Sequence, residues 1–370
     1  MKKLLFVVNV DWFFISHRLP IALAAIKKGY EVHLTCLITD KQKLLEDHGI
    51  IVHPLTLSRS GIGIFHELKT VKSLFTIISN VDPDITHCIT IKPVLYGNVI
   101  AKILKVPARV SSISGLGYVF IAKGIKAKIL RGFISLWYKF SLKGSKVVIF
   151  QNTADRDLLR NFGAVIPQQE ILIRGSGVDL NKYEVIPEPQ GDLVVMLVAR
   201  LLIDKGVNEF ASAANIIRSE RSDVRMVIIG DVDPENPKSI SQIQIERWVD
   251  DGIIEYWGYS QNVSNSIAKS NIMVLPSYRE GLPKSLIEAA ACGRAVVTTD
   301  VPGCRDAIIP NRTGLLVPVK SSELLADAIL KLVNNKLMRD ELAINGRELA
   351  ESDFDIEDVV NTHLDIYRNL

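Results

Sequence analysis

The stretch IMVLPSYREGLPKSLIEAAACGRAVVTTD, residues 272–300, reads as strand, turn, helix and strand in direct succession. The runs IMVLPS and AVVTTD contain only one charge, at the final Asp300, which is typical of strands covered on both faces of a parallel sheet. The small residues of SLIEAAACG predict a helix that packs closely on that sheet. Pro283 suits the first turn of this helix, because proline has no N–H to leave unsatisfied there.

The same alternation of strand and helix extends in both directions from this stretch, which predicts parallel βαβ units with right-handed crossovers. Further strands are predicted at 4–10, 30–37, 50–55, 84–90, 108–114, 146–152, 192–199, 224–230 and 253–258. Helices are predicted near 16–28, 64–79, 94–104, 125–143, 153–162, 206–218 and 239–250, with a helical segment from about residue 322 to the end.

These elements are too many for one ordinary hydrophobic core, since the chain has 370 residues. We expect an α/β protein with two doubly wound Rossmann-like domains that face each other across a cleft, with ligands beyond the carboxyl ends of the strands. The domains are expected at 1–183 and 192–352. The segment EVIPEPQG, 184–191, has the composition of a linker, and residues 353–370 are expected to form a helix that packs back on the first domain.

Cysteine usage and hydropathy predict a cytosolic protein. The four cysteines are scattered and form no CxxC or Cys/His cluster, so we expect reduced thiols and neither a disulfide framework nor a zinc site. The N-terminal MKKLLFVVNVDWFF could pass for a signal peptide, but Asp11 interrupts it and no cleavage site follows. No run of 18 apolar residues lacks a charge, so no membrane-spanning helix is expected.

Charge is distributed unevenly along the chain. Residues 1–183 contain 25 Lys and Arg against 12 Asp and Glu, a net of +13, and residues 184–370 contain 19 against 29, a net of −10, which together give +3. Between Asp84 and Asp155 there are eleven cations and no acid. A solvated surface usually mixes both signs, so this span predicts an anionic partner: a phospholipid surface, a phosphorylated substrate or a nucleic acid. No nucleic-acid-binding motif accompanies the charges, so we expect no nucleic acid partner.

Two carboxylates in the deciding stretch are candidates for sugar recognition. The strand 272–277 delivers Glu280 to its carboxyl tip, and Glu288 lies on the following helix, one turn after Lys284. Carboxylates bind vicinal hydroxyls well, and the N–H groups of a helix start attract an anion such as a diphosphate. An acid in the first turns of a helix can also simply complement the helix dipole. The residues predicted to line this helix start are Gly281, Leu282, Pro283, Lys284 and Ser285.

A second pair of candidates lies in VARLLIDKGVNEF, 198–210. Arg200 ends the first strand of the second domain and Lys205 precedes the next helix. Two cations at adjacent tips form a clamp for a diphosphate, whose negative charge grows as it leaves. Either residue alone would be interpreted as an ordinary exposed cation. Together with Glu280 in the same domain, they predict a catalytic site.

The segments EGLPKSLIEAAACG, 280–293, and ARLLIDKG, 199–206, together resemble the family 4 glycosyltransferases of the GT-B architecture. The resemblance covers nearly the whole chain. It implies a retaining enzyme that uses a nucleotide-sugar donor and needs neither a metal nor another cofactor. It also implies that Arg200 and Lys205 hold the diphosphate.

By the same resemblance, Glu288 holds the ribose, Glu280 contacts the transferred sugar and Tyr259 lies near the base. The segments SGLGYVFIAKG, GDVDPENP and LPSYREG are similar to those of transferases that build lipid-linked oligosaccharides on bacterial undecaprenyl diphosphate. This similarity implies a UDP-sugar donor, with N-acetylgalactosamine favoured, and a polyprenyl-diphosphate-linked sugar acceptor. Assembly of lipopolysaccharide O-antigen or capsule is an alternative pathway.

Three places in the first domain are candidates for facing the acceptor. The first is the predicted helix start at Ser16, where Ser16 is a possible cap. The second is Lys92, at the tip of the strand DITHCIT. The third is a glycine turn after the strand 108–114, which would allow a close approach of the backbone. His87, inside DITHCIT, is interpreted as a structural residue. The candidates are Ser16, His17, Arg18, Lys92, Gly115 and Gly117.

The segment 119–146 combines apolar residues at helical spacing with cations on another face, a pattern typical of a helix that lies on an anionic bilayer. A buried amphipathic helix with a basic rim is the alternative. The expected location is peripheral, on the cytoplasmic face of the inner membrane. The residues assigned to this surface are Lys123, Lys126, Lys128, Arg131, Phe133, Trp137, Lys139 and Lys143.

Two other classes of protein remain as rivals, a UDP-sugar 2-epimerase and a nonenzymatic binding protein. An epimerase would need no basic apolar segment, and a binding protein would need no pairing of carboxylates with cations. DxD tripeptides, which hold a metal in another fold of transferase, occur at 82–84, 155–157, 231–233 and 353–355. Asp231 and Asp233 lie in a loop rich in proline and asparagine and are interpreted as turn formers, so no metal site is expected.

Overall fold

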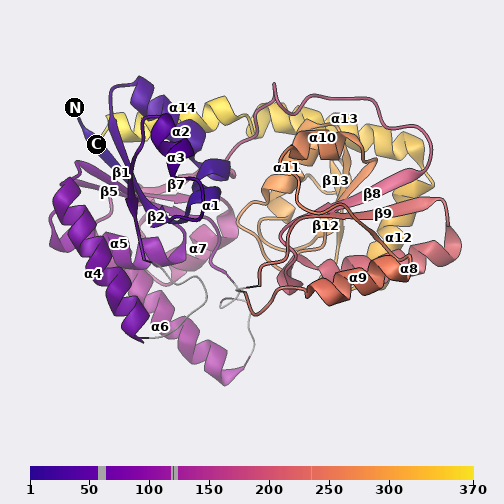
Figure 1. Ribbon diagram of the computed structural model, residues 1–370, viewed down its shortest axis with the longest axis horizontal. Helices are drawn as coiled ribbons and strands as arrows, with labels where there is room; N and C mark the ends of the chain where they lie inside the picture. Colours follow the sequence, from indigo (N-terminus) through magenta and orange to yellow (C-terminus); the bar gives the residue numbers. More distant parts are fainter. Residues whose placement is uncertain (57–63, 118–119, 121–123, 235) are drawn as a thin grey trace. The chain divides into compact units, whose positions relative to one another are not determined.

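The computed structural model describes residues 1–56, 64–117, 120, 124–234 and 236–370. These residues divide into two compact units. Unit 1 contains Met1–Ser176 together with Ile356–Leu370, and unit 2 contains Gly177–Asp355. Each unit is a parallel sheet with helices on both of its faces (Figure 1). The predicted doubly wound α/β fold is therefore confirmed within each unit.

Within the described residues, unit 1 has a seven-stranded sheet in the order β3-β2-β1-β4-β5-β6-β7, with every neighbouring pair parallel. Successive side chains of the central strand β1 enter different cores, because side chains alternate between the two faces of a strand. Leu4 and Phe6 lie in one core, and Leu5 and Val7 lie in the other. The strands are β1 Lys3–Val10, β2 Glu31–Leu37, β3 Ile51–Pro54, β4 Ile85–Ile89, β5 Ala108–Ile113, β6 Val147–Phe150 and β7 Glu170–Leu172.

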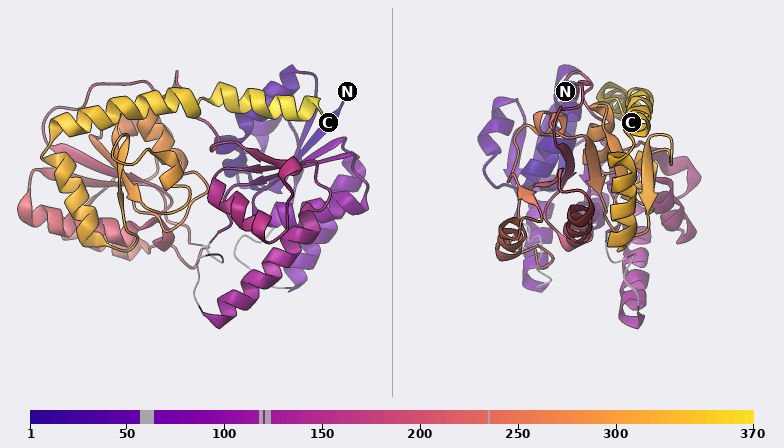
Figure 2. Two further views of the ribbon diagram at one scale, coloured as in Figure 1. Left: turned by 180° about the vertical axis from the view of Figure 1, so that it is seen from behind. Right: turned by 90° about the vertical axis from the view of Figure 1, so that its right-hand side faces the viewer.

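The helices of unit 1 form two layers. The core that contains Phe6 is covered by α1, α2, α3 and the C-terminal α14, and the core that contains Val7 is covered by α4, α5, α6 and α7. Drawn in yellow, α14 belongs to unit 1, where it packs against α2 (Figure 2). The helices are α1 Asp11–His17, α2 Leu19–Lys27, α3 Gln42–Asp47, α4 Ile64–Val81, α5 Ile91–Ile103, α6 Ile125–Leu142, α7 Thr153–Asn161 and α14 Ile356–Arg368.

Unit 2 has a six-stranded parallel sheet in its described part, in the order β10-β9-β8-β11-β12-β13. Cores on both faces contain the apolar strands that the sequence predicted. The strands are β8 Leu193–Val198, β9 Val224–Ile229, β10 Glu255–Tyr256, β11 Ile272–Leu275, β12 Ala295–Thr299 and β13 Gly314–Val317. The α-helices are α8 Val207–Glu220, α9 Gln242–Asp250, α10 Val263–Ala268, α11 Lys284–Ala291, α12 Ser322–Val333 and α13 Lys336–Asp353.

Several short elements were missed by the sequence analysis, and one helix was placed wrongly. The sequence analysis did not reveal α3, β7 or β13, which span six, three and four residues. The helix predicted near 16–28 is two helices, because the chain leaves helical geometry at Arg18 (φ −135°, ψ −13°). The first of them already begins at Asp11, directly after β1.

The connection between the units also differs from the expected one. The chain enters unit 2 at Gly177, ahead of the boundary expected after residue 183, because Val178 and Tyr183 are buried in a core of unit 2. Residues 184–191, expected as a linker, belong entirely to unit 2. We call residues 177–191 the entry segment.

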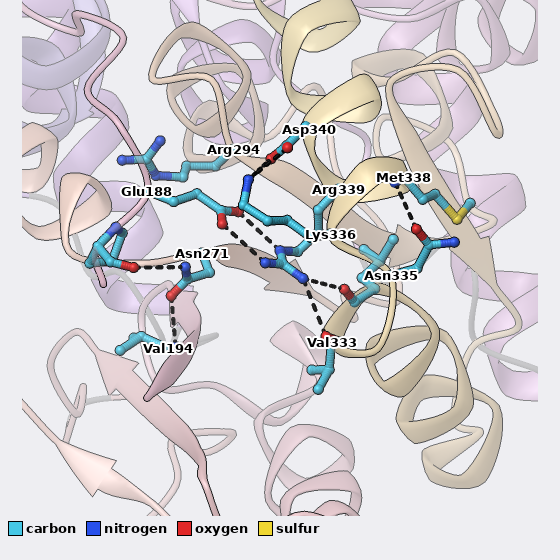
Figure 3. A network of polar contacts seen from close by, with 12 residues as sticks. Glu188, Val194, Asn271, Arg294, Val333, Asn335, Lys336, Met338, Arg339 and Asp340 are labelled. Atoms are coloured by element: carbon cyan, nitrogen blue, oxygen red, sulfur yellow. Dashed lines mark hydrogen bonds and ion pairs between the residues drawn. The ribbon is translucent and has the colours of Figure 1, made fainter. Parts of the chain in front are cut away.

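Polar contacts fix the second half of the entry segment to unit 2 (Figure 3). Arg339 on α13 is buried, and its Nε and Nη2 atoms each lie 3.0 Å from a carboxylate oxygen of Glu188. Arg294 donates to the Ile186 carbonyl at 2.8 Å, and Asn271 donates to the Pro189 carbonyl at 3.4 Å. The proline-rich composition therefore marks an extended strap here, not a flexible linker.

Removal of Glu188 is predicted to destabilise unit 2. Glu188→Ala leaves the buried Arg339 guanidinium without its carboxylate, which is expected to lower the free energy of unfolding by about 3 kcal/mol. Urea unfolding followed by circular dichroism measures this change. The matched control is Asp340→Ala, which removes the exposed Lys336–Asp340 pair of the same helix and should cost less than about 1 kcal/mol. Equal losses in the two variants would contradict the anchoring role.

Candidate active site

A compact polar cluster lies at the carboxyl ends of β8 and β11 in unit 2. Lys205 ends the short 3-10 helix Ile203–Lys205 that follows β8, and Glu280 lies on the loop that follows β11. The Lys205 Nζ atom is 2.5 Å from Glu280 Oε1, and the Ser277 hydroxyl lies 2.6 Å from the same oxygen. The structure thus brings together two residues that the sequence separates by 75 positions. Ser277, which the sequence analysis did not select, orients the carboxylate.

Backbone contacts hold these two loops together. The Tyr278 amide donates to the Asp204 carbonyl at 2.9 Å. Gly206 has φ +73°, and a Cβ atom there would lie 2.1 Å from the Pro276 carbonyl oxygen. Gly303 has φ +84°, and a Cβ atom there would lie 2.5 Å from the Glu280 carbonyl oxygen. Only glycine permits both this backbone conformation and this close approach, so these glycines set the separation of Lys205 and Glu280.

Arg200 lies at the end of β8, as predicted, with its Nη1 atom 3.4 Å from Asp233 Oδ2. Its side chain is 45% exposed, so the guanidinium is accessible to a ligand. Asp233 is part of a turn: its amide lies 2.8 Å from the Ser239 hydroxyl, and its carbonyl accepts from the Asn236 amide. In the part of the chain that the structure describes, no three His, Cys, Asp or Glu side chains gather as metal ligands would.

Glu288 lies on α11 and is almost fully buried. Its Oε1 atom accepts a hydrogen bond from the Tyr183 hydroxyl at 2.6 Å and lies 3.6 Å from Lys284 Nζ. Burial raises the pKa of the Glu288 carboxyl, and Lys284 and the Tyr183 hydrogen bond oppose this rise. Tyr183, like Ser277, was not among the residues selected from the sequence.

The turn before α11 differs in one detail from the prediction. Pro283 is the N-cap residue, with extended backbone (φ −72°, ψ 121°), and the helix begins one residue later, at Lys284. Leu282 is buried in the hydrophobic core, so only its backbone can serve a ligand. Gly281 is also buried, whereas Lys284 and Ser285 are partly exposed.

Tyr259 is 67% exposed. It follows Gly258, whose carbonyl accepts a hydrogen bond from the Gly230 amide, directly after β9.

The first group of acceptor-side candidates lies at the end of α1 and directly after it. Ser16 lies inside α1, so its predicted role as a helix cap was wrong. Arg18 is 1% exposed and lies near Tyr367 of α14, and burial lowers its pKa to about 10. It therefore cannot face an acceptor from this position. The His17 ring stacks on Phe13 with centroids 4.2 Å apart.

The remaining candidates are distributed around α5. Lys92 lies in the first turn of this helix and forms an ion pair with Glu67 of α4 at 2.7 Å. The turn after β5 has positive φ at Gly115 (+106°) and Gly117 (+74°), as a tight glycine turn requires. His87 is buried and bonded to Tyr367 and Ser112, which confirms its interpretation as a structural residue.

Asp11 is a buried acid that the sequence analysis did not select as a site residue. Its carboxylate accepts hydrogen bonds from the amides of Trp12, Thr39 and Lys41. It therefore fixes the loop after β2 at the carboxyl end of the unit 1 sheet. The signal was available in the sequence, since a single acid directly follows an apolar strand.

The apolar stripe of α6 lies on the surface of unit 1 and consists of Ile125, Ile129, Phe133, Leu136 and Phe140. Its large side chains are 55–80% exposed, so the alternative of a buried amphipathic helix does not hold for this stripe. Lys128 and Lys139 are exposed, whereas Trp137 packs against the core. Of the other assigned cations, Lys123 lies outside the described residues, and so does the side chain of Lys126. None of the described helices is long and apolar enough to cross a membrane.

Two family models match the chain. The glycosyl transferase 4-like model matches residues 3–152, and the model of glycosyl transferases group 1 matches residues 180–349. The first match falls in unit 1, and the second falls in unit 2 and contains Arg200, Lys205, Glu280 and Glu288.

Named relatives extend over nearly the whole chain. The N,N'-diacetylbacillosaminyl-diphospho-undecaprenol alpha-1,3-N-acetylgalactosaminyltransferase of Campylobacter jejuni is 29% identical over 95% of this chain and 94% of its own length. The UDP-Gal:alpha-D-GlcNAc-diphosphoundecaprenol alpha-1,3-galactosyltransferase of Escherichia coli is 23% identical over 84% of this chain and 82% of its own length.

The fold is shared with solved glycosyltransferase structures of the GT-B type. Anabaena HepE, solved in complex with UDP and glucose, superimposes with a TM-score of 0.79 at 17% identity, and the match covers 100% of both chains. Two Rossmann-like units with these family matches identify the protein as a member of the GT-B glycosyltransferases, with a glycosyl transferase 4-like domain followed by a group 1 domain.

Proposed function

We propose that the protein transfers a sugar from a UDP-sugar to a sugar linked to undecaprenyl diphosphate, with retention of configuration, in the assembly of a bacterial glycan. N-acetylgalactosamine is the favoured donor sugar. The observation that carries this proposal is the contact between Lys205 and Glu280 at the strand ends of unit 2, together with an accessible Arg200 in the loop that leads from β8 to Lys205. The names of the C. jejuni and E. coli relatives support the lipid-linked acceptor.

The proposed donor site uses each of these groups for a different part of the nucleotide-sugar. Arg200, Lys205 and the backbone amides at the start of α11 would hold the diphosphate, since cations and helix starts both favour an anion. Glu288 would accept hydrogen bonds from the ribose, and Glu280 would contact the transferred sugar. The HepE complex with UDP supports a uridine nucleotide in this fold.

The proposed reaction breaks the bond between the anomeric carbon and the β-phosphate oxygen of the donor. An acceptor hydroxyl forms the new bond on the same face, and its proton passes to the departing phosphate oxygen, so the products are UDP and the extended lipid-linked sugar. Negative charge grows on the diphosphate as the bond breaks. Arg200 and Lys205 therefore stabilise the transition state more than the bound donor. No metal is proposed, since these cations neutralise the diphosphate.

Unit 1 would bring the enzyme to its acceptor at the membrane. The exposed stripe of α6 and its neighbouring cations are the features of a helix that lies in the bilayer interface, where apolar side chains enter the lipid and cations meet anionic headgroups. We therefore propose a peripheral location on the cytoplasmic face of the inner membrane.

A transfer assay tests the proposed reaction. Purified enzyme, polyprenyl-diphospho-sugar acceptors, a panel of UDP-sugars and EDTA are combined, and lipid-extractable product is analysed by NMR. We expect transfer from one UDP-N-acetylhexosamine with an α-linkage from the α-donor, because attack and departure occur on the same face. A β-linkage would contradict retention, and loss of activity with EDTA would contradict metal independence. Interconversion of the UDP-sugar without transfer would identify an epimerase.

Lys205→Ala is predicted to reduce turnover by about 100-fold or more, with a much smaller change in KM for the UDP-sugar, because the lost charge acts chiefly on the departing diphosphate. Steady-state kinetics separates the two parameters. Lys331→Ala, at an exposed position of α12, is the matched control and should behave like the wild type. Unchanged turnover of Lys205→Ala would refute the clamp.

Charge reversal on α6 is predicted to weaken membrane binding. The double variant Lys128→Glu/Lys139→Glu should bind anionic vesicles at least about tenfold less tightly, since each cation near such a surface contributes about 1 kcal/mol. Co-sedimentation with vesicles that contain phosphatidylglycerol measures the affinity. Arg312→Glu/Lys331→Glu makes the same change of charge on unit 2 and should have little effect. Equal losses of vesicle affinity for both double variants would indicate that binding depends on net charge alone and not on the surface of α6.

A further inference from the structure

The entry segment of unit 2 reaches the proposed donor site through one side chain. Tyr183 is 6% exposed and Glu288 is 5% exposed, and the tyrosine hydroxyl donates to Glu288 Oε1 at 2.6 Å. Although 105 positions separate the two residues in the sequence, the contact is short and almost fully shielded from water. A hydrogen bond to a buried carboxylate is strong and expensive to lose.

The backbone around Tyr183 is held on both sides. The Val178 amide donates to the Phe354 carbonyl at 2.8 Å, and the Tyr183 amide donates to the Asp179 carbonyl at 2.9 Å. Arg347 of α13 donates to the Tyr183 carbonyl at 2.8 Å and to the Ala291 carbonyl, at the end of α11, at 2.7 Å. The tyrosine is therefore fixed relative to the helix that carries Glu288, so its hydroxyl has a defined position.

The surroundings of Glu288 explain why an orienting donor matters. Lys284, one turn earlier on α11, approaches the same Oε1 atom at 3.6 Å, and Lys182 lies near enough to lower the pKa of the carboxyl. The buried thiol of Cys292, four residues after Glu288 at the end of α11, has a pKa raised to about 12, mainly by burial. Among these groups, Tyr183 makes the shortest contact with Glu288. The Tyr183 hydrogen bond and the 3.6 Å approach of Lys284 both fall on Oε1.

We propose that Tyr183 is a positioning residue that fixes the Glu288 carboxylate for the ribose hydroxyls of the donor, so that the entry segment forms part of the nucleotide site. The inference rests on the proposed role of Glu288. Tyr183 itself does not touch the reacting atoms. Its effect should therefore appear in the affinity for the nucleotide and not in the chemical step.

Tyr183→Phe tests the inference with little change of shape. We expect the Kd for UDP, measured by calorimetry, and the KM for the UDP-sugar to rise about tenfold, with kcat within about twofold of the wild type. The acid limb of kcat/KM should move to higher pH, because loss of the donor raises the pKa of the Glu288 carboxyl. Tyr138→Phe is the control, since its buried hydroxyl has no hydrogen-bond partner among the described residues.

Glu288→Ala separates failure of this inference from failure of the proposed donor site. We expect Glu288→Ala to weaken UDP binding more than Tyr183→Phe does, and the double variant to bind no more weakly than Glu288→Ala alone, because the tyrosine acts through the carboxylate. If Glu288→Ala weakens binding while Tyr183→Phe changes neither Kd nor the acid limb, the inference is overturned and the donor site stands. If Glu288→Ala leaves UDP binding unchanged, the donor site itself is wrong. If Tyr183→Phe lowers the thermal stability but leaves the acid limb of the kcat/KM pH profile unshifted, Tyr183 has only a structural role.

Discussion

The close approach of the loops after β8 and β11 is the constraint on which the site of unit 2 depends. The Tyr278 amide and the Ser277 hydroxyl both contact the Asp204 carbonyl at 2.9 Å, and Gly206 leaves no space between its backbone and Pro276. Because both strands are parallel neighbours, their carboxyl ends meet at one edge of the sheet. The ion pair of Lys205 and Glu280 follows from this geometry, since each residue lies within three positions of a contact between the loops.

The entry segment serves unit 2 in two ways. Its second half is tied to α13 by the buried contact of Glu188 with Arg339, which is an anchor for the fold (Figure 3). Its first half ends at Tyr183, which contacts Glu288. Arg347, also on α13, donates to the backbone of both Tyr183 and the end of α11, which fixes the tyrosine relative to the helix of Glu288. A segment with the composition of a linker is therefore part of the proposed donor site.

Unit 1 separates a buried polar network from an exposed apolar surface. On one face of the sheet, His87, Tyr367 and His363 pack together, and burial lowers the pKa of His87 well below its usual range. The hydrogen bond between His87 and Tyr367 joins α14 to β4. On the other face, α6 packs its Tyr138 side into the core and leaves its stripe from Ile125 to Phe140 in solvent. The two faces of the unit 1 sheet therefore differ. The polar side chains of α14 are buried on one face, whereas the apolar stripe of α6 is exposed on the other.

The sequence by itself determined the doubly wound fold, the apolar strands of both sheets and the positions of Arg200, Lys205, Glu280 and Glu288 along the chain, because alternating strands and helices and strand-end motifs are local patterns. It also determined the apolar stripe of α6, although not that the stripe is exposed. Only the tertiary structure decided that Arg18 is buried, that residues 184–191 are a strap, and that Ser277 and Tyr183 orient the two glutamates. These properties depend on contacts between residues far apart in the chain, such as the 105 positions from Tyr183 to Glu288, and no local pattern encodes such distances.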